Sequence, residues 1–178
     1  MDKVLKRVLK RINPTKAEVK KIKKVSDEII KSLNKRAQDL GVEVDVVLAG
    51  STSRGTFMRG NHDLDFFLRF ESEKKIKKFY KKLCRGFFVK RKKLVHGTRE
   101  YYKFNYKGFD VELVPSVKFK SPDKADNSAD ISYFHIDYLK KKLTPNLKKQ
   151  VLLLKHFLKA NDVYGAESAR GGFSGYVC

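Results

Sequence analysis

The sequence predicts a mixed α/β domain of about 120 residues followed by the start of a helical region. Three observations predict it: an amphipathic helical pattern near the N-terminus, several short strand-like runs up to residue 119, and helical patterns after Pro122. With 41% hydrophobic residues, the chain of 178 residues can bury a core of this size. We place the first domain at residues 1–125 and the helical segment at residues 126–178.

The first helix is predicted over residues 15–40. Thr15 and Glu18 fit a capping box, apolar residues recur at helical spacing from position 22 to position 40, and Gly41 ends the pattern. Pro14 argues against helix immediately before this element.

Strand-like runs and one further helix complete the first domain. The runs rich in β-branched and aromatic residues are 42–50, 64–70, 87–95, 99–107 and 109–119. A narrow apolar stripe surrounded by lysines predicts a surface helix at residues 73–84. Lys107-Gly108 predicts a tight turn between the last two strands.

The helical region begins after a polar connector. A helix or helix-like turn is predicted at residues 131–143, and a longer helix follows that ends near Asn161. Thr144 is placed to cap this last helix, with Pro145 at its first position. Its predicted apolar face comprises Leu147, Val151, Leu154, Phe157 and Leu158.

The charge of the chain indicates an anionic partner. There are 41 Lys and Arg against 20 Asp and Glu, a formal net charge of +21. Nucleic acid and a polyphosphate ligand both fit this charge, although a generally lysine-rich surface is the alternative explanation. Because no apolar run approaches the ~20 residues of a membrane helix, we expect no membrane partner. Cys84 and Cys178 are isolated, which favours reduced thiols and a cytoplasmic location.

Paired carboxylates open one of the predicted strands. Asp63 and Asp65 project from one face of that strand, with Cα atoms roughly 6.5 Å apart, because side chains alternate across a strand. Asp110 and Glu112 share a face in the same way on the last strand. If the two strands are neighbours, the carboxylates converge, and a hard divalent cation such as Mg²⁺ or Mn²⁺ explains them best. Ordinary surface charges on an exposed strand face are the alternative.

The loop between residues 50 and 56 adds a second functional feature. Gly50 and Ser51 follow a strand, and the next residues can open a short helix that includes Arg54. Exposed backbone N–H groups, a hydroxyl and a guanidinium together form an anion cradle. A phosphate cradle just upstream of a metal site is the layout expected for a metal-bound nucleoside triphosphate.

These motifs resemble those of the nucleotidyltransferase superfamily headed by DNA polymerase β, and in particular the archaeal, class I CCA-adding tRNA nucleotidyltransferases. The segments LLKHFLKANDVYGAE (153–167) and GFSGYVC (172–178) are also similar to this family's central domain. The loop and carboxylate motifs read Gly50-Ser51-x-x-Arg54-Gly55-Thr56 and Gly60-x-x-Asp63-x-Asp65. The resemblance implies an α+β fold, with a polymerase β-like mixed sheet and flanking helices in the catalytic domain, followed by the start of a helical central domain.

The resemblance also implies roles for individual residues. Asp63, Asp65 and Glu112 would be catalytic and would hold two Mg²⁺ ions, with Mn²⁺ as a substitute. Glu112 stands where the family usually has Asp. The implied nucleotide-binding residues are Gly50, Ser51, Arg54, Ser132, His135, Lys155 and Tyr164.

The implied activity is template-independent transfer from CTP and ATP to the 3′-hydroxyl of tRNA, which is CCA addition or repair. The family's tRNA-holding domains are absent from this sequence, so a fragment, a subunit with a partner that supplies those domains, and a shortened enzyme all remain open. Two other functions also remain open. A minimal nucleotidyltransferase could act on another RNA, a protein or a small molecule. A non-catalytic nucleic-acid-binding module would explain the charge but not the paired carboxylates.

Overall fold

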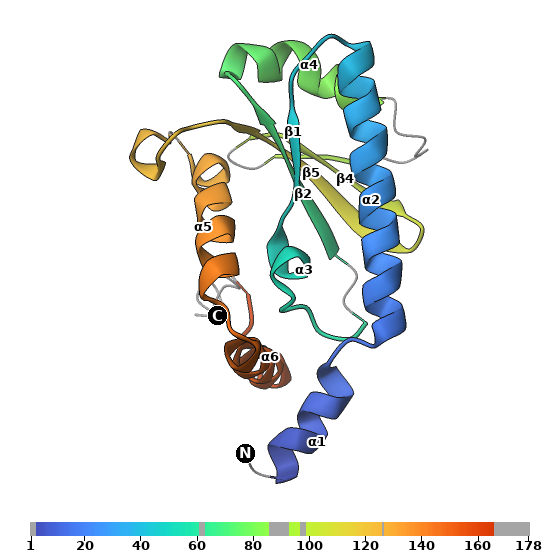
Figure 1. Ribbon diagram of the computed structural model, residues 1–178, viewed down its shortest axis with the longest axis vertical. Helices are drawn as coiled ribbons and strands as arrows, with labels where there is room; N and C mark the ends of the chain where they lie inside the picture. Colours follow the sequence, from blue (N-terminus) through green and yellow to red (C-terminus); the bar gives the residue numbers. More distant parts are fainter. Residues whose placement is uncertain (1–2, 61–62, 86–92, 97–98, 126, 166–178) are drawn as a thin grey trace.

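A mixed β-sheet forms the centre of the protein. The computed structural model describes residues 3–60, 63–85, 93–96, 99–125 and 127–165. Within these residues the sheet has the strand order β1-β2-β5-β4-β3, with β2 and β5 parallel and the other pairs antiparallel (Figure 1). The strands are β1 (Asp45–Leu48), β2 (Asp63–Phe70), β3 (Lys93–Val95), β4 (Tyr101–Tyr106) and β5 (Phe109–Val117).

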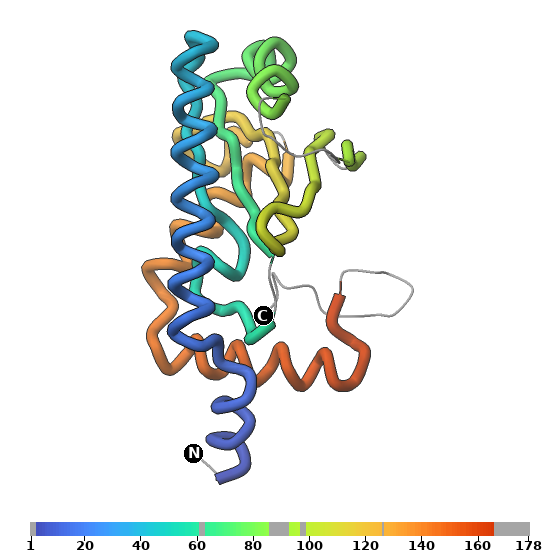
Figure 2. Tube along the Cα trace, turned by 90° about the vertical axis from the view of Figure 1, so that its right-hand side faces the viewer, coloured from blue at the N-terminus to red at the C-terminus, as the bar shows by residue number. Residues whose placement is uncertain are grey.

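Helices cover both faces of this sheet. The long α2 runs along one side and α5 lies on the other, as the two views show (Figures 1 and 2). The helices are α1 (Lys3–Ile12), α2 (Lys16–Asp39), α3 (Gly50–Arg54), α4 (Glu73–Arg85), α5 (Ser128–Lys142) and α6 (Pro145–Ala160), and a 3₁₀ turn spans Pro122–Lys124. The mixed sheet with flanking helices that the sequence predicts is therefore confirmed.

The main core lies between the sheet, α2 and α4. Leu64, Phe66 and Leu68 of β2 are fully buried there, as the alternation of that strand predicts. Thr15 caps α2 in a capping box with Glu18, which confirms the predicted start of that helix. These features anchor β2, so that the carboxylates at its beginning are carried on a rigid strand.

A smaller apolar cluster fills the opposite face. It joins Ala49 and Phe67 to Ala129 and Ile136 of α5. Because α5 covers only the far part of β2, Phe67 is buried while Asp63, at the beginning of the strand, is exposed. The uncovered end of β2 is therefore where a ligand has access to the strand.

Several strand and helix predictions hold within a few residues. The turn at Lys107 and Gly108 is confirmed by positive φ angles of 52° and 81°. Thr144 caps α6 and Pro145 is its first residue, as predicted. β1 is shorter than the predicted run 42–50. Of the predicted strand at 87–95, residues 93–95 form β3 and residues 87–92 lie outside the described residues.

Helix α1 was not expected from the sequence. Pro14 disfavours helix only in the residues next to it, and α1 ends before it at Ile12. Leu9 and Ile12 are buried against Leu152 of α6, so the helix is stabilised by tertiary packing. The N-terminal residues thereby support α6 from one side.

The predicted apolar face of α6 is wrong in most of its members. The buried residues are Leu152, Lys155 and Leu158, whereas Leu154 is exposed and Phe157 is 63% exposed. This rotation places Leu152 against α1 and turns Lys155 toward the carbonyl of Thr56, which follows α3. The boundary predicted between residues 125 and 126 stays a prediction.

The described helices include none that is both long enough and apolar enough to cross a membrane.

Candidate active site

A cavity of about 850 Å³ lies where β2, α3, α5 and α6 meet. It contains side chains from segments far apart in the sequence, including Lys103 of β4 and Lys159 of α6. All ten predicted site residues line it: Gly50, Ser51, Arg54, Asp63, Asp65, Glu112, Ser132, His135, Lys155 and Tyr164. Their assembly in one cavity is a property of the fold, and their individual roles remain proposals.

The parallel pairing of β2 and β5 brings the carboxylates together. Asp63 lies opposite Asp110, and Asp65 lies opposite Glu112. Burial, together with the negative charges of Glu112 and Asp63, raises the pKa of Asp65 from 3.8 to about 6. The site therefore holds more negative charge than its surroundings stabilise.

The structure also separates the two acidic residues of β5. Asp110 accepts a hydrogen bond from Nδ2 of Asn105 at 3.2 Å, near the tip of the β4–β5 hairpin, and does not line the cavity. Glu112 lines the cavity beside Asp65. Glu112 is thus the better candidate for the third carboxylate, which is the residue that the family resemblance implies.

Lys103 is a site residue that the sequence analysis missed. Its Nζ donates to Oε1 of Glu112 at 2.8 Å, and the two residues face each other across β4 and β5. A signal was available, because the tight turn at residues 107 and 108 fixes the register of the hairpin and so places position 103 opposite position 112.

The Gly50–Ser51 turn is tied to β2 by backbone contacts. The N–H of Ala49 donates to the carbonyl of Asp65 at 2.7 Å, and the hydroxyl of Thr52 donates to the carbonyl of Asp63 at 2.9 Å. Gly50 has φ of +61°, and a Cβ atom there would lie 1.9 Å from Oδ2 of Asp65. Glycine is therefore required for both the backbone conformation and the space taken by the carboxylate.

Helix α6 forms a basic wall of the cavity. Lys155 is only 6% exposed, and its Nζ donates to the carbonyl of Thr56 at 3.2 Å. The Nζ atoms of Lys155 and Lys159 lie 5.9 and 5.5 Å from the ring centre of Tyr164. A buried lysine that lines a cavity is suited to binding an anion.

Helix α5 contributes Ser132 and His135 to the cavity. The hydroxyl of Ser132 donates to the carbonyl of Ser128 at 2.6 Å, while His135 is exposed. A hydroxyl group can both donate and accept a hydrogen bond, so this type of side chain suits a polar ligand.

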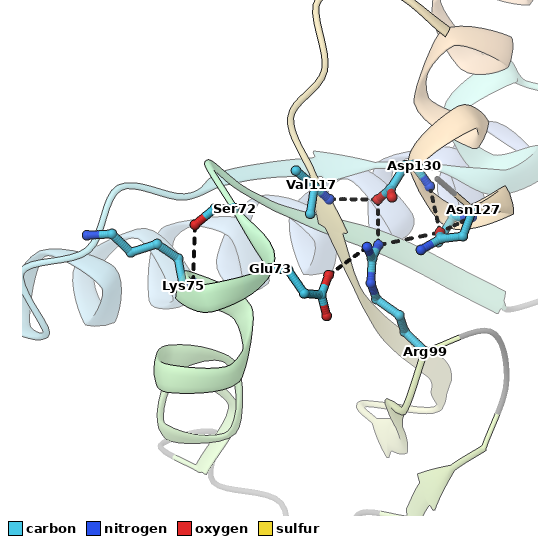
Figure 3. Close-up of polar contacts among 8 residues, drawn as sticks. Ser72, Glu73, Lys75, Arg99, Val117, Asn127 and Asp130 are labelled. Carbon is cyan, nitrogen blue, oxygen red and sulfur yellow. Dashed lines mark hydrogen bonds and ion pairs between the residues drawn. The ribbon is translucent and has the colours of Figure 1, made fainter. Parts of the chain in front are cut away.

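An ion-pair network around the buried Asp130 fixes the first turn of α5 (Figure 3). Arg99 donates to Asp130 at 2.5 Å and to Glu73 of α4 at 2.7 Å. Asp130 also accepts from the backbone N–H of Val117 at 2.7 Å, so it joins the end of β5 to α5. The network, which the sequence analysis did not identify, sets the position of the helix that carries Ser132.

The carboxylates fit a divalent metal by the chemistry of their donors. Carboxylate oxygens are the ligands that Mg²⁺ and Mn²⁺ prefer, and the repulsion around Asp65 would be relieved by a cation. Among the described residues, no group of three acidic, histidine or cysteine side chains is already arranged as a metal cage. Glu112 is instead directed to Lys103, so cage formation would require Glu112 to change partner.

Two protein-family models match the chain. A family model described as "Nucleotidyltransferase domain" matches residues 26–151, and one described as "tRNA nucleotidyltransferase, second domain" matches residues 149–178. The first match contains the turn at Gly50, the three carboxylates and both site residues of α5.

Curated relatives match nearly the whole of this chain. The chain is 34% identical to a "CCA-adding enzyme" of Methanosarcina barkeri, over 96% of this chain and 38% of the relative. It is 36% identical to a "CCA-adding enzyme" of Nanoarchaeum equitans, over 93% of this chain and 41% of the relative. The chain therefore spans about two-fifths of the length of the curated relatives it matches.

Solved structures share the fold at lower identity. Cid1, described for its RNA terminal uridylyl transferase activity, matches 98% of this chain and 51% of its own chain, with a TM-score of 0.70 and 20% identity. The CdnC protein of E. coli MS115-1, in complex with HORMA-deltaN, matches 94% of this chain and 61% of its own, with a TM-score of 0.68 and 17% identity. These two likenesses concern the fold alone.

Proposed function

Because the chain belongs to the nucleotidyltransferase domain family, we propose that it adds nucleotides from CTP and ATP to the 3′-hydroxyl of tRNA without a template. The proposal is supported by the relatives named CCA-adding enzyme and by the second-domain match at residues 149–178. The excess of basic residues is consistent with an RNA partner.

One observation carries the enzymatic part of this proposal. The register of β2 and β5 places Asp63, Asp65 and Glu112 in one cavity with the Gly50–Ser51 turn. A nucleic-acid-binding module has no use for carboxylates that repel both one another and phosphate. Nucleotidyl transfer uses such a cluster, because the triphosphate arrives with divalent cations.

Asp63, Asp65 and Glu112 are the residues proposed to hold two Mg²⁺ ions, for which Mn²⁺ is a substitute. When bound, such ions supply activation of the attacking hydroxyl and neutralisation of charge on the transferred phosphate. The strands β2 and β5 hold these carboxylate oxygens in fixed positions. The absence of a side chain at Gly50 leaves the space that Asp65 occupies.

The basic side of the cavity is proposed to bind the triphosphate. Ser51 and Arg54 offer hydrogen bonds from α3, and Lys155 and Tyr164 face them from the C-terminal side of the cavity. His135 is proposed to contact the triphosphate and ribose. The pyrophosphate formed in the reaction leaves from this basic side, where its charge is stabilised.

This chain matches about two-fifths of the length of its relatives, and we propose that recognition of tRNA also needs polypeptide that corresponds to the rest. The lysines of this chain attract RNA through phosphates, and such contacts fix neither register nor the 3′ end. Polypeptide corresponding to the rest of the relatives is proposed to hold the tRNA, either as a second subunit or as further sequence of the same protein.

The test is incubation with labelled CTP or ATP and tRNA that lacks its 3′ end, with products read at nucleotide resolution. Addition of C and then A that is lost in Asp65→Asn supports the proposal. Addition to unrelated RNAs with equal efficiency would favour a different substrate. Absence of Mg²⁺-dependent CTP and ATP binding would remove the enzymatic assignment altogether.

A further inference from the structure

A row of alternating charges crosses the sheet at the candidate metal site. Asp65 of β2 lies opposite Glu112 of β5, and Glu112 lies opposite Lys103 of β4. Lys93 of β3 lies on the other side of Lys103. The like charge of Lys93 disfavours that direction for the Lys103 ammonium, which makes its ion pair with Glu112 instead.

The neighbouring row provides an internal comparison. There Asp63 lies opposite Asp110, and Asp110 lies opposite Asn105, whose neutral amide donates to it. Both acidic residues of β5 thus have a hydrogen-bond donor on β4. Only the one beside Asp65 has a cation as its donor, so the charge is placed at the carboxylate that the proposed function assigns to the metal.

We propose that Lys103 is an internal counter-ion of the carboxylate site, which a divalent cation must displace from Glu112 before the site can close around the metal. The ammonium and a metal ion would use the same Glu112 carboxylate, and two cations at one carboxylate repel each other. The inference rests on the proposed function, because it takes Asp63, Asp65 and Glu112 as metal ligands.

The structure allows Lys103 to make this exchange. In the part of the chain the structure describes, Lys103 is the one cationic side chain within 4 Å of Asp63, Asp65 or Glu112. Its side chain is 46% exposed and lines the cavity, so it has open space into which it can move. Its flexible four-carbon stem lets the ammonium leave Glu112 and remain in the cavity. Lys103 is therefore a positioning residue that acts through Glu112.

Removal of this charge should tighten metal binding. We expect Lys103→Met to bind Mn²⁺ about two- to fivefold more tightly than the unaltered protein, the range for loss of a solvent-accessible ion pair. The measurement is titration with Mn²⁺ alone, in the absence of nucleotide, followed by electron paramagnetic resonance of the free ion. Lys103→Arg retains the cation and should return the affinity toward that of the unaltered protein.

Lys107→Met is the matched control. Lys107 lies at the tip of the same hairpin, is similarly exposed at 52%, and pairs with Glu28 away from the cavity at 2.6 Å. The Lys107→Met substitution removes one positive charge, as Lys103→Met does, but leaves Glu112 paired. It should therefore leave the Mn²⁺ affinity nearly unchanged. Equal tightening in both variants would show a general charge effect and overturn the inference.

Thermal unfolding provides a second readout. Without metal, Lys103→Met should unfold at a lower temperature than the unaltered protein, because Glu112 then faces Asp65 without a counter-ion. Saturating Mn²⁺ should remove most of this difference. A purely structural lysine would instead cause the same loss with and without Mn²⁺, and that result would also overturn the inference. Lys103→Gln serves the same comparison if the methionine variant does not fold.

The experiment separates this inference from the proposed function. Mn²⁺ binding that is lost in Asp65→Asn tests the metal site by itself. If the unaltered protein shows no such binding, the metal site of the proposed function fails. If it binds and Lys103→Met binds no more tightly than Lys107→Met, only the role of Lys103 is wrong.

Discussion

Two acidic clusters on the α5 side of the sheet differ in how their charge is balanced. Around Asp130, the carboxylate accepts from Arg99 and from a backbone N–H, and Arg99 also pairs with Glu73 (Figure 3). In the cavity, one of the three carboxylates, Glu112, pairs with the exposed Lys103 at 2.8 Å, and the charges of Glu112 and Asp63 oppose that of Asp65. In the first cluster a cation lies between two carboxylates, although Oδ2 of Asp130 has no hydrogen-bond partner among the described residues, and the second has an excess of negative charge.

The difference separates a structural cluster from a functional one. Asp130 is buried and bridges the end of β5 to α5, so its charge stabilises the fold only because Arg99 compensates it. Asp65 has a raised pKa because burial and neighbouring carboxylates oppose its charge. A fold retains such repulsion where a ligand relieves it. Neutralising one carboxylate in each cluster should therefore have opposite effects on stability.

The largest expected effect is on catalysis, from Asp65→Asn. Replacing this negatively charged carboxylate, a proposed metal ligand, with a neutral amide should reduce the rate of nucleotide addition by about a thousandfold or more. The same change should stabilise the metal-free protein by about 1–2 kcal/mol, because it removes repulsion with Glu112 and Asp63. Single-turnover addition and urea unfolding in chelator check the two parts. A variant that is inactive and also unfolds more easily would place Asp65 among the structural residues.

The opposite result is expected for Asp130→Asn. This substitution keeps an acceptor for the N–H of Val117 but leaves the Arg99 charge with Glu73 alone, so unfolding should become easier by about 2–3 kcal/mol. Urea unfolding measures it. Lys23→Met breaks an exposed pair with Asp27 on α2 and is the control, with an expected change below about 0.5 kcal/mol. Equal effects of the two substitutions would remove the distinction between a buried network and a surface pair.

The two acidic residues of β5 sharpen the comparison within the cavity itself. Glu112→Gln should reduce nucleotide addition by about a hundredfold, whereas Asp110→Asn should reduce it by less than about threefold. The reason is that Glu112 faces Asp65, while Asp110 is bonded to Asn105 near the hairpin tip. The rates of addition under identical Mg²⁺ concentrations give the order. If Asp110→Asn reduces the rate more than Glu112→Gln does, the third carboxylate of the site is Asp110 and not Glu112.

Much of the carboxylate side of the site could be predicted from the sequence, because strand geometry is local. Alternation places Asp63 with Asp65 and Asp110 with Glu112, and burial of Leu64 on the other face fixes which way the strand turns. The parallel pairing of the two strands could only be assumed. Their register depends on contacts between segments more than forty residues apart.

The helical side was harder to predict because tertiary contacts decide it. The apolar residues of α6 fit more than one rotation of the helix, and packing against α1 selects the one that buries Lys155. Helix α1 itself depends on that contact. No local sequence pattern around Arg99 predicts its ion pair with Asp130, since the two residues are brought together by the path of the chain between β5 and α5. The resemblance to a family, rather than any local pattern, pointed to Lys155 and Tyr164.

The smallest effect concerns the basic wall opposite the carboxylates. Lys155 is buried and lines the cavity, with its Nζ 3.2 Å from the carbonyl of Thr56, so its charge is held by the fold near the proposed triphosphate. Lys155→Met keeps much of the apolar stem but removes one charge-assisted hydrogen bond. We therefore expect CTP and ATP to bind about tenfold more weakly. Lys141→Met removes the same charge from an exposed pair on α5 and is the control, with no change expected. Equilibrium binding of nucleotide with Mg²⁺ distinguishes them. Equal weakening in both would mean that the net charge of the protein, rather than the basic wall of the cavity, attracts the nucleotide.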